Sequence, residues 1–521
     1  MHIVIVGGGT AGWATALMAA TRWQQHKVTV IESTKIGVIG VGESTTGRLT
    51  DLVNNFFYDF GCNHDEFIAE TGATLKYSIK HKGWTNNIDE FYQGPIDGSW
   101  TNSASPDALF AYGIANLSHH DGVGKTSKIG HRILAGGSNF NKTTNTFNDY
   151  NHAMHVDAHL VGKYFKKVCL RNNLNANHID SEVVDVKLHV ETGFIESVLL
   201  KDGRTIEGDF FIDCSGFAKV LMNKLPNQWI SYQKNLPINT GLPFQLKYLD
   251  NEMPEPYTTA WAQKSGWMWQ IPLMDRKGCG YVFSDEFTTP DKAQEEIEII
   301  LGREIDPIKV IKFHTGRQDN AWVKNCITIG LSSAFLEPLE ATSIHTTIVQ
   351  AHNFVFEYCG NTLEETVNEG SMKIYNQRTK KMFDDVKDFL VMHYMGGRSD
   401  SEFWKYIGTG ATKTDFVESL LSMSKTRLPS SNDFPQYQGS AGWALYSFVM
   451  AGLHMFDSNL GNNALQQLLP RHGSMADIAL ETFYELQWKW DQEVNECYSY
   501  NDFIKYFRQL RYKNGFSDIK Y

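Results

Sequence analysis

The chain has 521 residues, of which 42% are hydrophobic and 21% are charged, and it carries a net charge of −11 at pH 7. This composition is typical of a globular protein with a large core, and the length favours two closely packed domains or one elaborated α/β domain. The negative charge argues against a nucleic-acid-binding protein, and no uncharged apolar run is long enough to span a bilayer.

The seven cysteines are scattered along the chain and include no C-x-x-C pair. An odd, dispersed set is typical of reduced thiols rather than of a disulfide framework, and the histidines do not gather around the cysteines as zinc ligands would. The first residues enter a strand without a basic segment or a cleavage site. We therefore expect a cytoplasmic protein that holds no metal.

A dinucleotide-binding pattern opens the chain. Residues 2–6 form an apolar, β-branched run that predicts a buried parallel strand, and residues 13–20 predict a helix. The turn between them fits G-x-G-x-x-G, whose glycines allow a tight turn and let pyrophosphate approach the backbone N–H groups at the start of the helix. The residues predicted to bind the cofactor here are Gly7, Gly9, Thr10, Ala11 and Gly12.

A second predicted strand, residues 27–31, ends at Glu32, about twenty residues beyond the last glycine, as the dinucleotide pattern requires. The Glu32 carboxylate is placed to bind ribose hydroxyls. FAD and NAD share this first β-α-β unit, so the segment does not choose between them.

Three later segments extend the cofactor site. The loop at 37–45 is rich in glycine and ends in Ser44-Thr45, a pair that could cap a helix starting near Thr46. The same loop could place Gly40, Gly42 and Ser44 against a planar ring. Apolar strands followed by small-residue turns recur at 209–216 and at 325–333, where the turn contains Gly330. Three such returns to one nucleotide favour a large, split FAD domain over a compact NAD domain.

From residue 340 onwards helical spacing dominates, as in 373–391 and 474–490. We predict an α/β fold, in which an FAD-binding Rossmann-like domain of the flavin monooxygenase type spans residues 1–340. A mostly helical substrate cap then spans residues 341–521.

The string at 266–272, Gly-Trp-Met-Trp-Gln-Ile-Pro, matches the G-W-x-W-x-I-P signature of flavin-dependent halogenases. Without that resemblance, Trp267 and Trp269 would be interpreted as an aromatic core stripe on one face of a strand. The two interpretations are compatible, because a rigid aromatic wall can also keep substrate away from a flavin. The signature residues assigned to the tunnel are Trp267, Trp269, Ile271 and Pro272.

Further segments in the same order resemble the tryptophan-halogenase branch of this family. They are residues 7–13, 40–45, 155–160, 213–217 and 335–342. The family's catalytic lysine lies in an A-x-aromatic-K stretch, which here is Ala73-Thr74-Leu75-Lys76, with leucine at the aromatic position. The resemblance therefore implies that Lys76 is catalytic, with Lys80 and Lys82 as nearby competitors.

The resemblance also implies that Glu340 is the second catalytic residue, although a carboxylate near a helix N-terminus can simply accept backbone N–H groups. Family members bind halide at the turn occupied here by Thr342 and Ser343. Ala341 stands where the family has serine, and Ser343 stands where it has glycine. The resemblance to the family therefore predicts the halide site less closely than it predicts the rest of the site.

The implied activity is halogenation of an electron-rich aromatic by a cytoplasmic enzyme that uses reduced FAD, oxygen and a halide ion. Hypohalous acid would travel to Lys76, where it is hydrogen-bonded or becomes a haloamine. No second dinucleotide motif is found for NADH, so a separate flavin reductase is expected to supply reduced FAD. A single-component aromatic monooxygenase and a non-catalytic flavin-binding protein are the alternatives.

The region that would grip a substrate departs from tryptophan-specific members of the family. The stretch from Gln436 to Trp443 leads quickly to Ala451-Gly452-Leu453, which predicts a shortened lid and a site open to indoles, phenols or similar rings. Tyr437, Trp443 and Tyr446 could line it, although each could equally pack in the core. The sequence leaves open the physiological substrate, the halide preference and whether the chain forms a homo-oligomer.

Overall fold

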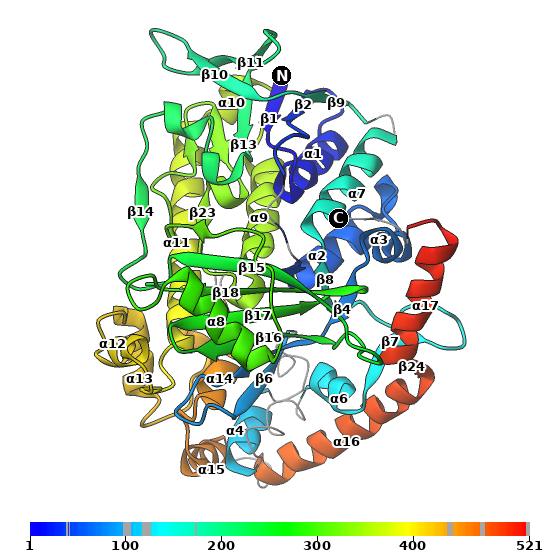
Figure 1. Cartoon of the computed structure of the whole chain (residues 1–521), viewed down its shortest axis with the longest axis vertical. Helices are drawn as coiled ribbons and strands as arrows, with labels where there is room; N and C mark the ends of the chain where they lie inside the picture. The colour runs from blue at the N-terminus through cyan, green and yellow to red at the C-terminus, as the bar shows by residue number, and fades with distance from the viewer. Residues whose placement is uncertain are drawn as a thin grey trace.

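A computed structural model describes residues 1–37, 40, 42–96, 106–116, 127–171, 174–434, 441–468 and 475–516. Along the longest axis, a mainly parallel sheet with helices around it occupies one end, a mostly antiparallel sheet lies in the middle, and helices gather at the other end (Figure 1). The arrangement is the predicted α/β fold.

The sheet at the first end has six strands in the order β21-β22-β13-β1-β2-β9. All neighbours are parallel except the short outer strand β21. The predicted β-α-β unit and its later returns to the same sheet are therefore confirmed. The strands are β1 (His2–Val6), β2 (Lys27–Glu32), β9 (Ala176–Asp180), β13 (Phe210–Asp213), β21 (Trp322–Val323) and β22 (Cys326–Thr328).

Helix α1 (Thr10–Arg22) follows β1 and is buried over most of its length because small residues let it approach the sheet closely. A Cβ atom on Gly12 would lie 1.8 Å from the Gly7 carbonyl oxygen. A Cβ atom on Gly330 would lie 2.9 Å from the Cβ of Ala11. These two glycines thus have a packing role. Helices α7 (Ala158–Arg171) and α9 (Thr342–Asn353) pack against α1.

The central sheet has seven strands in the order β19-β15-β18-β17-β16-β5-β6, antiparallel except between β16 and β5. A small sheet, in the order β3-β8-β4, lies beside it. The strands of the central sheet are β5 (Ser78–Lys82), β6 (Phe91–Pro95), β15 (Thr240–Lys247), β16 (Tyr257–Gln263), β17 (Gly266–Pro272), β18 (Arg276–Phe283) and β19 (Ile311–Lys312). Those of the small sheet are β3 (Glu43–Ser44), β4 (Thr74–Lys76) and β8 (Ala153–Val156).

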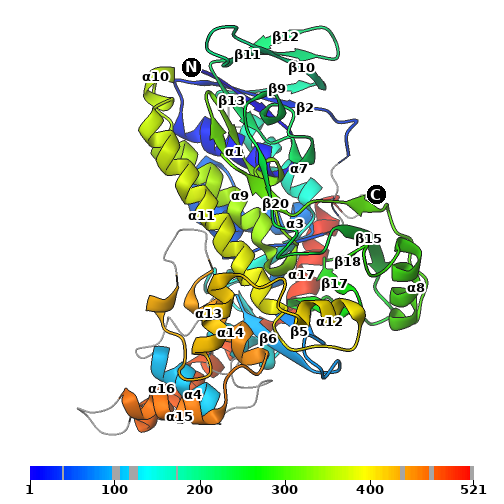
Figure 2. The same cartoon turned by 90° about the vertical axis from the view of Figure 1, so that its left-hand side faces the viewer.

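The part of the chain after residue 340 is mostly helical, as predicted, with β24 (Cys497–Ser499) as a short exception. The predicted helix at 373–391 is the core of α11 (Glu369–His393), which begins at the capping side chain of Asn368. The other helices are α10 (Leu363–Thr366), α12 (Glu402–Gly408), α13 (Asp415–Met423), α14 (Trp443–Gly452), α15 (Ser458–Gln467), α16 (Met475–Glu496) and α17 (Tyr500–Lys513). Figure 2 shows α15 and α16 beside α4 (Pro106–Asn116), at the end of the molecule away from α1.

The remaining elements connect these layers. The helices are α2 (Gly47–Asp51), α3 (His64–Thr71), α6 (Lys128–Leu134) and α8 (Pro290–Leu301). The strands are β7 (Gly137–Asn141), β10 (Val183–Leu188), β11 (Ile195–Leu200), β12 (Thr205–Glu207), β14 (Trp229–Ser231), β20 (Gly316–Gln318) and β23 (Ala334–Phe335).

Two large apolar clusters hold the layers together. One joins β1 and α1 to α9 and α17, and the other joins β17 to α11 and α14. Each cluster draws on both sides of residue 340, so the division into two domains at that point stays a prediction. Within the described residues, no helix is both long and apolar enough to cross a membrane. All seven cysteines are described, and none forms a disulfide.

Candidate active site

Lys76 is the last residue of β4, and its side chain is buried within the protein. Its Nζ atom donates a hydrogen bond to the carbonyl oxygen of Thr45, 2.8 Å away, at the end of the glycine-rich loop. Burial lowers the pKa of Lys76 to about 8, although the negative charge of Glu340 opposes this shift. A buried amine that is partly neutral near physiological pH can act both as a donor and as a nucleophile.

The competing lysines lie elsewhere. Lys80 and Lys82 are half-buried on strand β5, with their Nζ atoms 4.0 Å and 3.9 Å from the ring centroids of Phe91 and Trp261. These amines rest on aromatic faces. The burial of Lys76 therefore favours the assignment predicted from the sequence.

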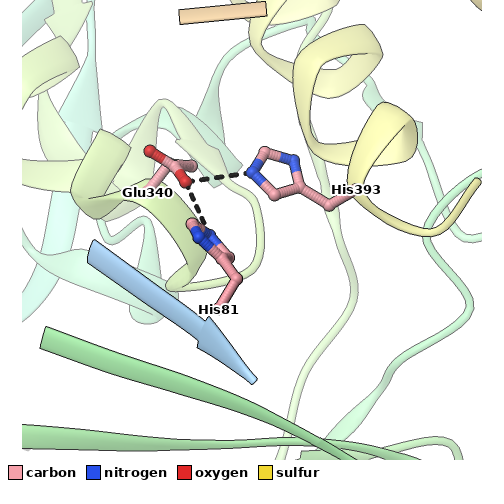
Figure 3. A group of neighbouring side chains, drawn as sticks. All are labelled: His81, Glu340 and His393. Atoms are coloured by element: carbon pink, nitrogen blue, oxygen red, sulfur yellow. Dashed lines mark hydrogen bonds and ion pairs between the residues drawn. The ribbon is translucent and has the colours of Figure 1, made fainter. Parts of the chain in front are cut away.

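Glu340 lies in the turn that precedes α9, where two successive residues have left-handed backbone angles. The φ angle is 64° at Glu340 and 57° at Ala341. Non-glycine residues rarely adopt this conformation, and it is retained only where the surrounding structure holds it in place. The turn directs the Glu340 carboxylate toward two histidines (Figure 3).

Both histidines approach the same carboxylate oxygen. The Nε2 atoms of His81 and His393 each lie 2.9 Å from Oε1 of Glu340. Burial would raise the pKa of Glu340, but the contacts from His393 and His81 outweigh it and hold that pKa well below its usual range. Glu340 is therefore a carboxylate in the same buried region as Lys76.

Two histidines and a carboxylate are also a common set of metal ligands. In a tetrahedral zinc site with bonds near 2.1 Å, however, ligand atoms spread around the ion at separations of about 3.4 Å. Here both imidazoles converge on one oxygen at 2.9 Å, and the His393 contact is a hydrogen bond while the His81 contact is not. This convergence on one oxygen differs from the spread of ligand atoms around a metal ion.

His81 and His393 were not identified from the sequence. His81 comes from β5, and His393 is the last residue of α11, so no local spacing connects either of them with Glu340. The one available signal is strand alternation, because His81 lies between Lys80 and Lys82 and must face the other side of the strand.

The signature strand β17 is linked to both predicted catalytic residues. Near its start, Nε1 of Trp267 donates to Glu337, 3.1 Å away and three residues before Glu340. At its end, the Pro272 carbonyl accepts a hydrogen bond of 2.5 Å from the hydroxyl of Thr74, two residues before Lys76. One strand thereby fixes the spacing between the two segments.

Glu337 itself is fully enclosed and also accepts a hydrogen bond from the hydroxyl of Tyr394. Burial raises its pKa to about 7, although the bonds from Tyr394 and Trp267 oppose the shift. Sequence analysis missed this residue, although the F-x-E-P-L-E segment contains it.

Trp267 is buried beside Trp84, so its packing role is established. Trp269 is half-buried, and a Cβ atom on Gly280 opposite would lie 2.2 Å from its ring. Ile271 packs toward Gly42, where a Cβ atom would lie 3.5 Å from its side chain. The signature strand therefore also reaches the glycine-rich loop, and its role as a tunnel wall stays a prediction.

The predicted cofactor loops divide into open and packed positions. A Cβ atom on Gly9 would have no described atom within 4 Å, and one on Gly40 would only touch Ala158 at 3.6 Å. Thr10 is held by a hydrogen bond of 3.0 Å to the Ala158 carbonyl. The open space at Gly9 fits a site where a phosphate approaches the start of α1.

One prediction about the glycine-rich loop was wrong. Ser44 and Thr45 do not cap the following helix, because Thr46 accepts the hydrogen bond from the Arg48 amide. The Ser44 hydroxyl instead lies 2.7 Å from that of Thr258, and its contact with a cofactor stays a prediction. Residues 38, 39 and 41 of this loop lie outside the described residues.

Glu32 ends β2 as predicted, and its carboxylate already has protein partners. Lys166 Nζ and His178 Nε2 lie 2.6 Å and 2.9 Å from one oxygen, and Trp13 donates to the other at 3.2 Å. Burial opposes ionisation, but these partners lower the pKa of Glu32 to about 2. Its predicted contact with ribose would be made by a fixed carboxylate.

Thr342 and Ser343 form the first turn of α9. The first N–H groups of a helix have no acceptor within the helix, and its positive end attracts anions. The backbone is thus suitable for halide, while the Ser343 carbonyl accepts hydrogen bonds from Thr346 and Thr347. Halide binding at these two residues stays a prediction.

The residues predicted to line the substrate site lie in different environments. Tyr446 packs in the core against Phe389 and Phe434. Trp443 is half-buried and lies 5.9 Å from Phe110. Gln436 and Tyr437 lie outside the described residues, and so does most of the predicted lid.

Comparisons with known proteins agree with this geometry. The family model described as tryptophan halogenase matches residues 2–462. A 7-chloro-L-tryptophan 6-halogenase of Kutzneria is 30% identical over 479 residues, covering 86% of this chain and 90% of that protein.

Solved structures extend the similarity to nearly the whole chain. A tryptophan halogenase from Shewanella frigidimarina superposes with a TM-score of 0.85 at 23% identity, covering 98% of each chain, and shows the shared fold. A flavin-dependent halogenase from Brevundimonas has a TM-score of 0.81 at 25% identity, covering 97% of this chain and 99% of that one.

Replacing Glu337 with glutamine tests the buried carboxyl group behind the signature tryptophan. Because its pKa is raised to about 7 in the folded protein, folding takes up a proton, and stability falls as pH rises from about 4.5 to 7. Between pH 5 and pH 8 we expect the free energy of unfolding to fall by about 2–3 kcal/mol more in the parent than in Glu337→Gln. Urea denaturation at both pH values measures this difference.

The exposed Glu402 provides the control, since Glu402→Gln should leave the pH dependence of the parent unchanged. Equal pH dependence in the parent and in Glu337→Gln would show that Glu337 ionises normally.

Proposed function

Because this chain belongs to the tryptophan halogenase family, we propose that it halogenates an electron-rich aromatic through hypohalous acid delivered to Lys76. It is a flavin-dependent halogenase. The observation that carries the finer proposal is the buried Lys76 amine, which is influenced by the charge of Glu340 and hydrogen-bonded to the glycine-rich loop. A separate flavin reductase would supply the reduced cofactor.

The residues present fit FAD. Gly9 leaves open space at the start of α1, where the backbone N–H groups would hold the pyrophosphate, and Glu32 would hold the ribose. Gly40, Gly42 and Ser44 would lie toward the flavin ring. When bound and reduced, FAD supplies with oxygen the oxidising equivalent that converts halide into hypohalous acid.

The protein positions and separates the reactants. Thr342 and Ser343 would hold the halide through their backbone N–H groups, and the signature strand would keep the substrate from the flavin. Lys76 would hold hypohalous acid by a hydrogen bond or accept its halogen on the free amine. The aromatic carbon would be held next to that amine, so that position determines where the halogen is added.

Product analysis tests the proposal directly. The chain, a flavin reductase, FAD, NADH and bromide should convert an indole or a phenol into a product with the isotope pattern of bromine. A hydroxylated product, or rapid NADH oxidation by the chain without a reductase, would indicate a monooxygenase instead.

The pair Gly9→Val and Gly12→Val separates cofactor binding from folding. Space around Gly9 is open and its φ angle is −75°, so Gly9→Val should keep the melting temperature of the parent while FAD affinity falls at least about 100-fold. Gly12→Val should lower the melting temperature, because its Cβ would collide with the Gly7 carbonyl. Flavin fluorescence and thermal melting measure both. Unchanged FAD affinity in Gly9→Val would mean that the cofactor binds elsewhere.

Lys76→Met should separate formation of the oxidant from its use. The variant keeps a long side chain in the buried site, so it should bind FAD and still oxidise bromide, as measured with a soluble trap for hypobromous acid. Production of brominated arene should fall by about 100-fold or more, because the group that positions the halogen is lost.

Lys80→Met is the matched control, since its half-buried amine lies over the Phe91 ring, and it should retain the activity of the parent. If Lys76→Met retained activity while Lys80→Met lost it, the catalytic role would move to Lys80.

We also expect a permissive enzyme that uses bromide at least as readily as chloride. The lid predicted at 436–443 offers few groups to hold the charged ends of an amino acid, so other rings should be accepted. Ala341 and Ser343 depart from the family's halide turn, and weakly hydrated bromide is less sensitive to an imperfect anion site. Steady-state kinetics with indole, phenol and tryptophan measure both preferences. A single regioisomer from tryptophan and chloride, at a far higher kcat/KM than the others, would contradict this expectation.

A further inference from the structure

Glu340 shares a single carboxylate oxygen with two enclosed imidazoles from distant parts of the chain (Figure 3). His81 and His393 are almost completely shielded, and the Glu340 side chain is 12% exposed. Such an arrangement is stable only if protons occupy the contacts, because three lone pairs facing one another would repel. The positions of those protons can be worked out from the outer partners of the rings.

The protonation of Nδ1 in His393 follows from its hydrogen-bond partner. Its Nδ1 atom lies 2.9 Å from the carbonyl oxygen of Phe389, one turn earlier in α11. A carbonyl oxygen only accepts hydrogen bonds, so Nδ1 must carry a proton. Nε2 then faces Glu340 either as a second N–H group or as a lone pair, and its contact with Oε1 requires one further proton.

That further proton is on the histidine. The contacts from His393 and His81 hold the pKa of Glu340 well below its usual range, so the carboxyl group is ionised. In the 2.9 Å contact Nε2 of His393 is then the donor and Oε1 of Glu340 the acceptor, so that both ring nitrogens donate. Its Nε2 proton is the one that lies between the ring and Glu340.

His81 provides the second contact in a neutral form. Its ring stacks on Tyr92, with centroids 4.6 Å apart and planes 10° from parallel, which fixes the direction of Nε2. Neither Nδ1 nor Nε2 has a partner in hydrogen-bond geometry among the described residues, although Nε2 lies 2.9 Å from Oε1 of Glu340, and burial lowers the pKa of the ring. His81 is therefore a neutral ring that packs against the shared oxygen.

We propose that His393 is a positioning residue that stores one proton for Glu340, and that His81 holds the shared oxygen in place. This inference rests on the proposed function. It adds a store for the proton that Glu340 gives up and takes back during the halogenation step.

His393 and Glu340 together supply and recover the proton that the halogenation step needs. The ring carbon forms a bond to halogen as the halogen–oxygen bond breaks, and the oxygen leaves with the electron pair as hydroxide. The stored proton passes from His393 through Glu340 to that oxygen, which departs as water. The C–H bond of the ring then breaks, its electrons restore aromaticity, and the proton returns to Glu340 and His393.

The variant His393→Gln tests this role, because glutamine can donate a hydrogen bond but cannot store a proton. We expect FAD binding and oxidation of bromide to be unchanged and kcat for arene bromination to fall about 10- to 100-fold, with KM changing less than about 3-fold. Loss of the proton from the aromatic ring of the substrate should also become slow. A ring-deuterated substrate should then show a primary isotope effect in the variant, of about 2 or more, that the parent lacks.

Two further variants serve as a control and a comparison. His131→Gln removes another histidine–carboxylate contact, to Asp491 on the distant helix α16, and should behave like the parent. His81→Gln should lower kcat less than His393→Gln does and show no isotope effect. Activity of His393→Gln within about 2-fold of the parent, without an isotope effect, would overturn the proposal.

Nuclear magnetic resonance gives a readout that needs neither a substrate nor a stable variant. With 15N-labelled histidine in the parent at pH 7, His393 should show both nitrogens protonated and His81 only one. An unprotonated Nε2 on His393 would overturn the proposal even if the enzyme is active. If no arene is halogenated but these protonation states are found, the proposed function fails while the stored proton stands.

Discussion

The candidate active site depends on one strand that is anchored at both ends. Through Trp267 and Glu337, strand β17 holds the turn that carries Glu340, and through Pro272 and Thr74 it holds the strand that carries Lys76. The hydrogen bond at the Trp267 end is enclosed, so losing either partner would leave a buried polar group unpaired, which costs about 1–3 kcal/mol. This constraint gives the G-W-x-W-x-I-P signature a physical meaning, because its first tryptophan and its proline set the spacing of two segments that are more than 250 residues apart in the sequence.

The turn at Glu340 and Ala341 shows why such anchoring is needed. Two successive non-glycine residues in left-handed conformation cost on the order of 1–3 kcal/mol each. No side chain caps the N-terminus of α9, so its N–H groups stay available to an anion. Glu337 holds one side of the turn, and the two histidines hold its carboxylate. The strained turn thereby brings a fixed carboxylate and the open end of a helix next to each other.

The sequence was sufficient to predict the local elements that carry the predicted cofactor residues. The glycine turn, β1, α1 and Glu32 follow each other within about thirty residues, and the burial of Lys76 agrees with its predicted role. The histidines were missed because their contacts depend on how β5 and α11 pack against the Glu340 turn. The Thr46 cap was misplaced by one or two residues, because neighbouring hydroxyl side chains are equally good capping groups and tertiary contacts decide between them. Glu337 was overlooked because a buried carboxyl group next to a proline has no distinctive spacing.

Anomalous diffraction at the bromine edge, from crystals of the chain with FAD and bromide, tests most directly the claim that the Glu340 turn joins the cofactor site to the reacting site. We expect a bromide peak at the backbone N–H groups of Thr342 and Ser343, and Lys76 on the far side of the signature strand from the flavin. The pyrophosphate of FAD should lie at the Gly7–Gly12 turn, and its flavin ring toward Gly40, Gly42 and Ser44. A bromide peak elsewhere, or flavin density on the same side of the strand as Lys76, would contradict it.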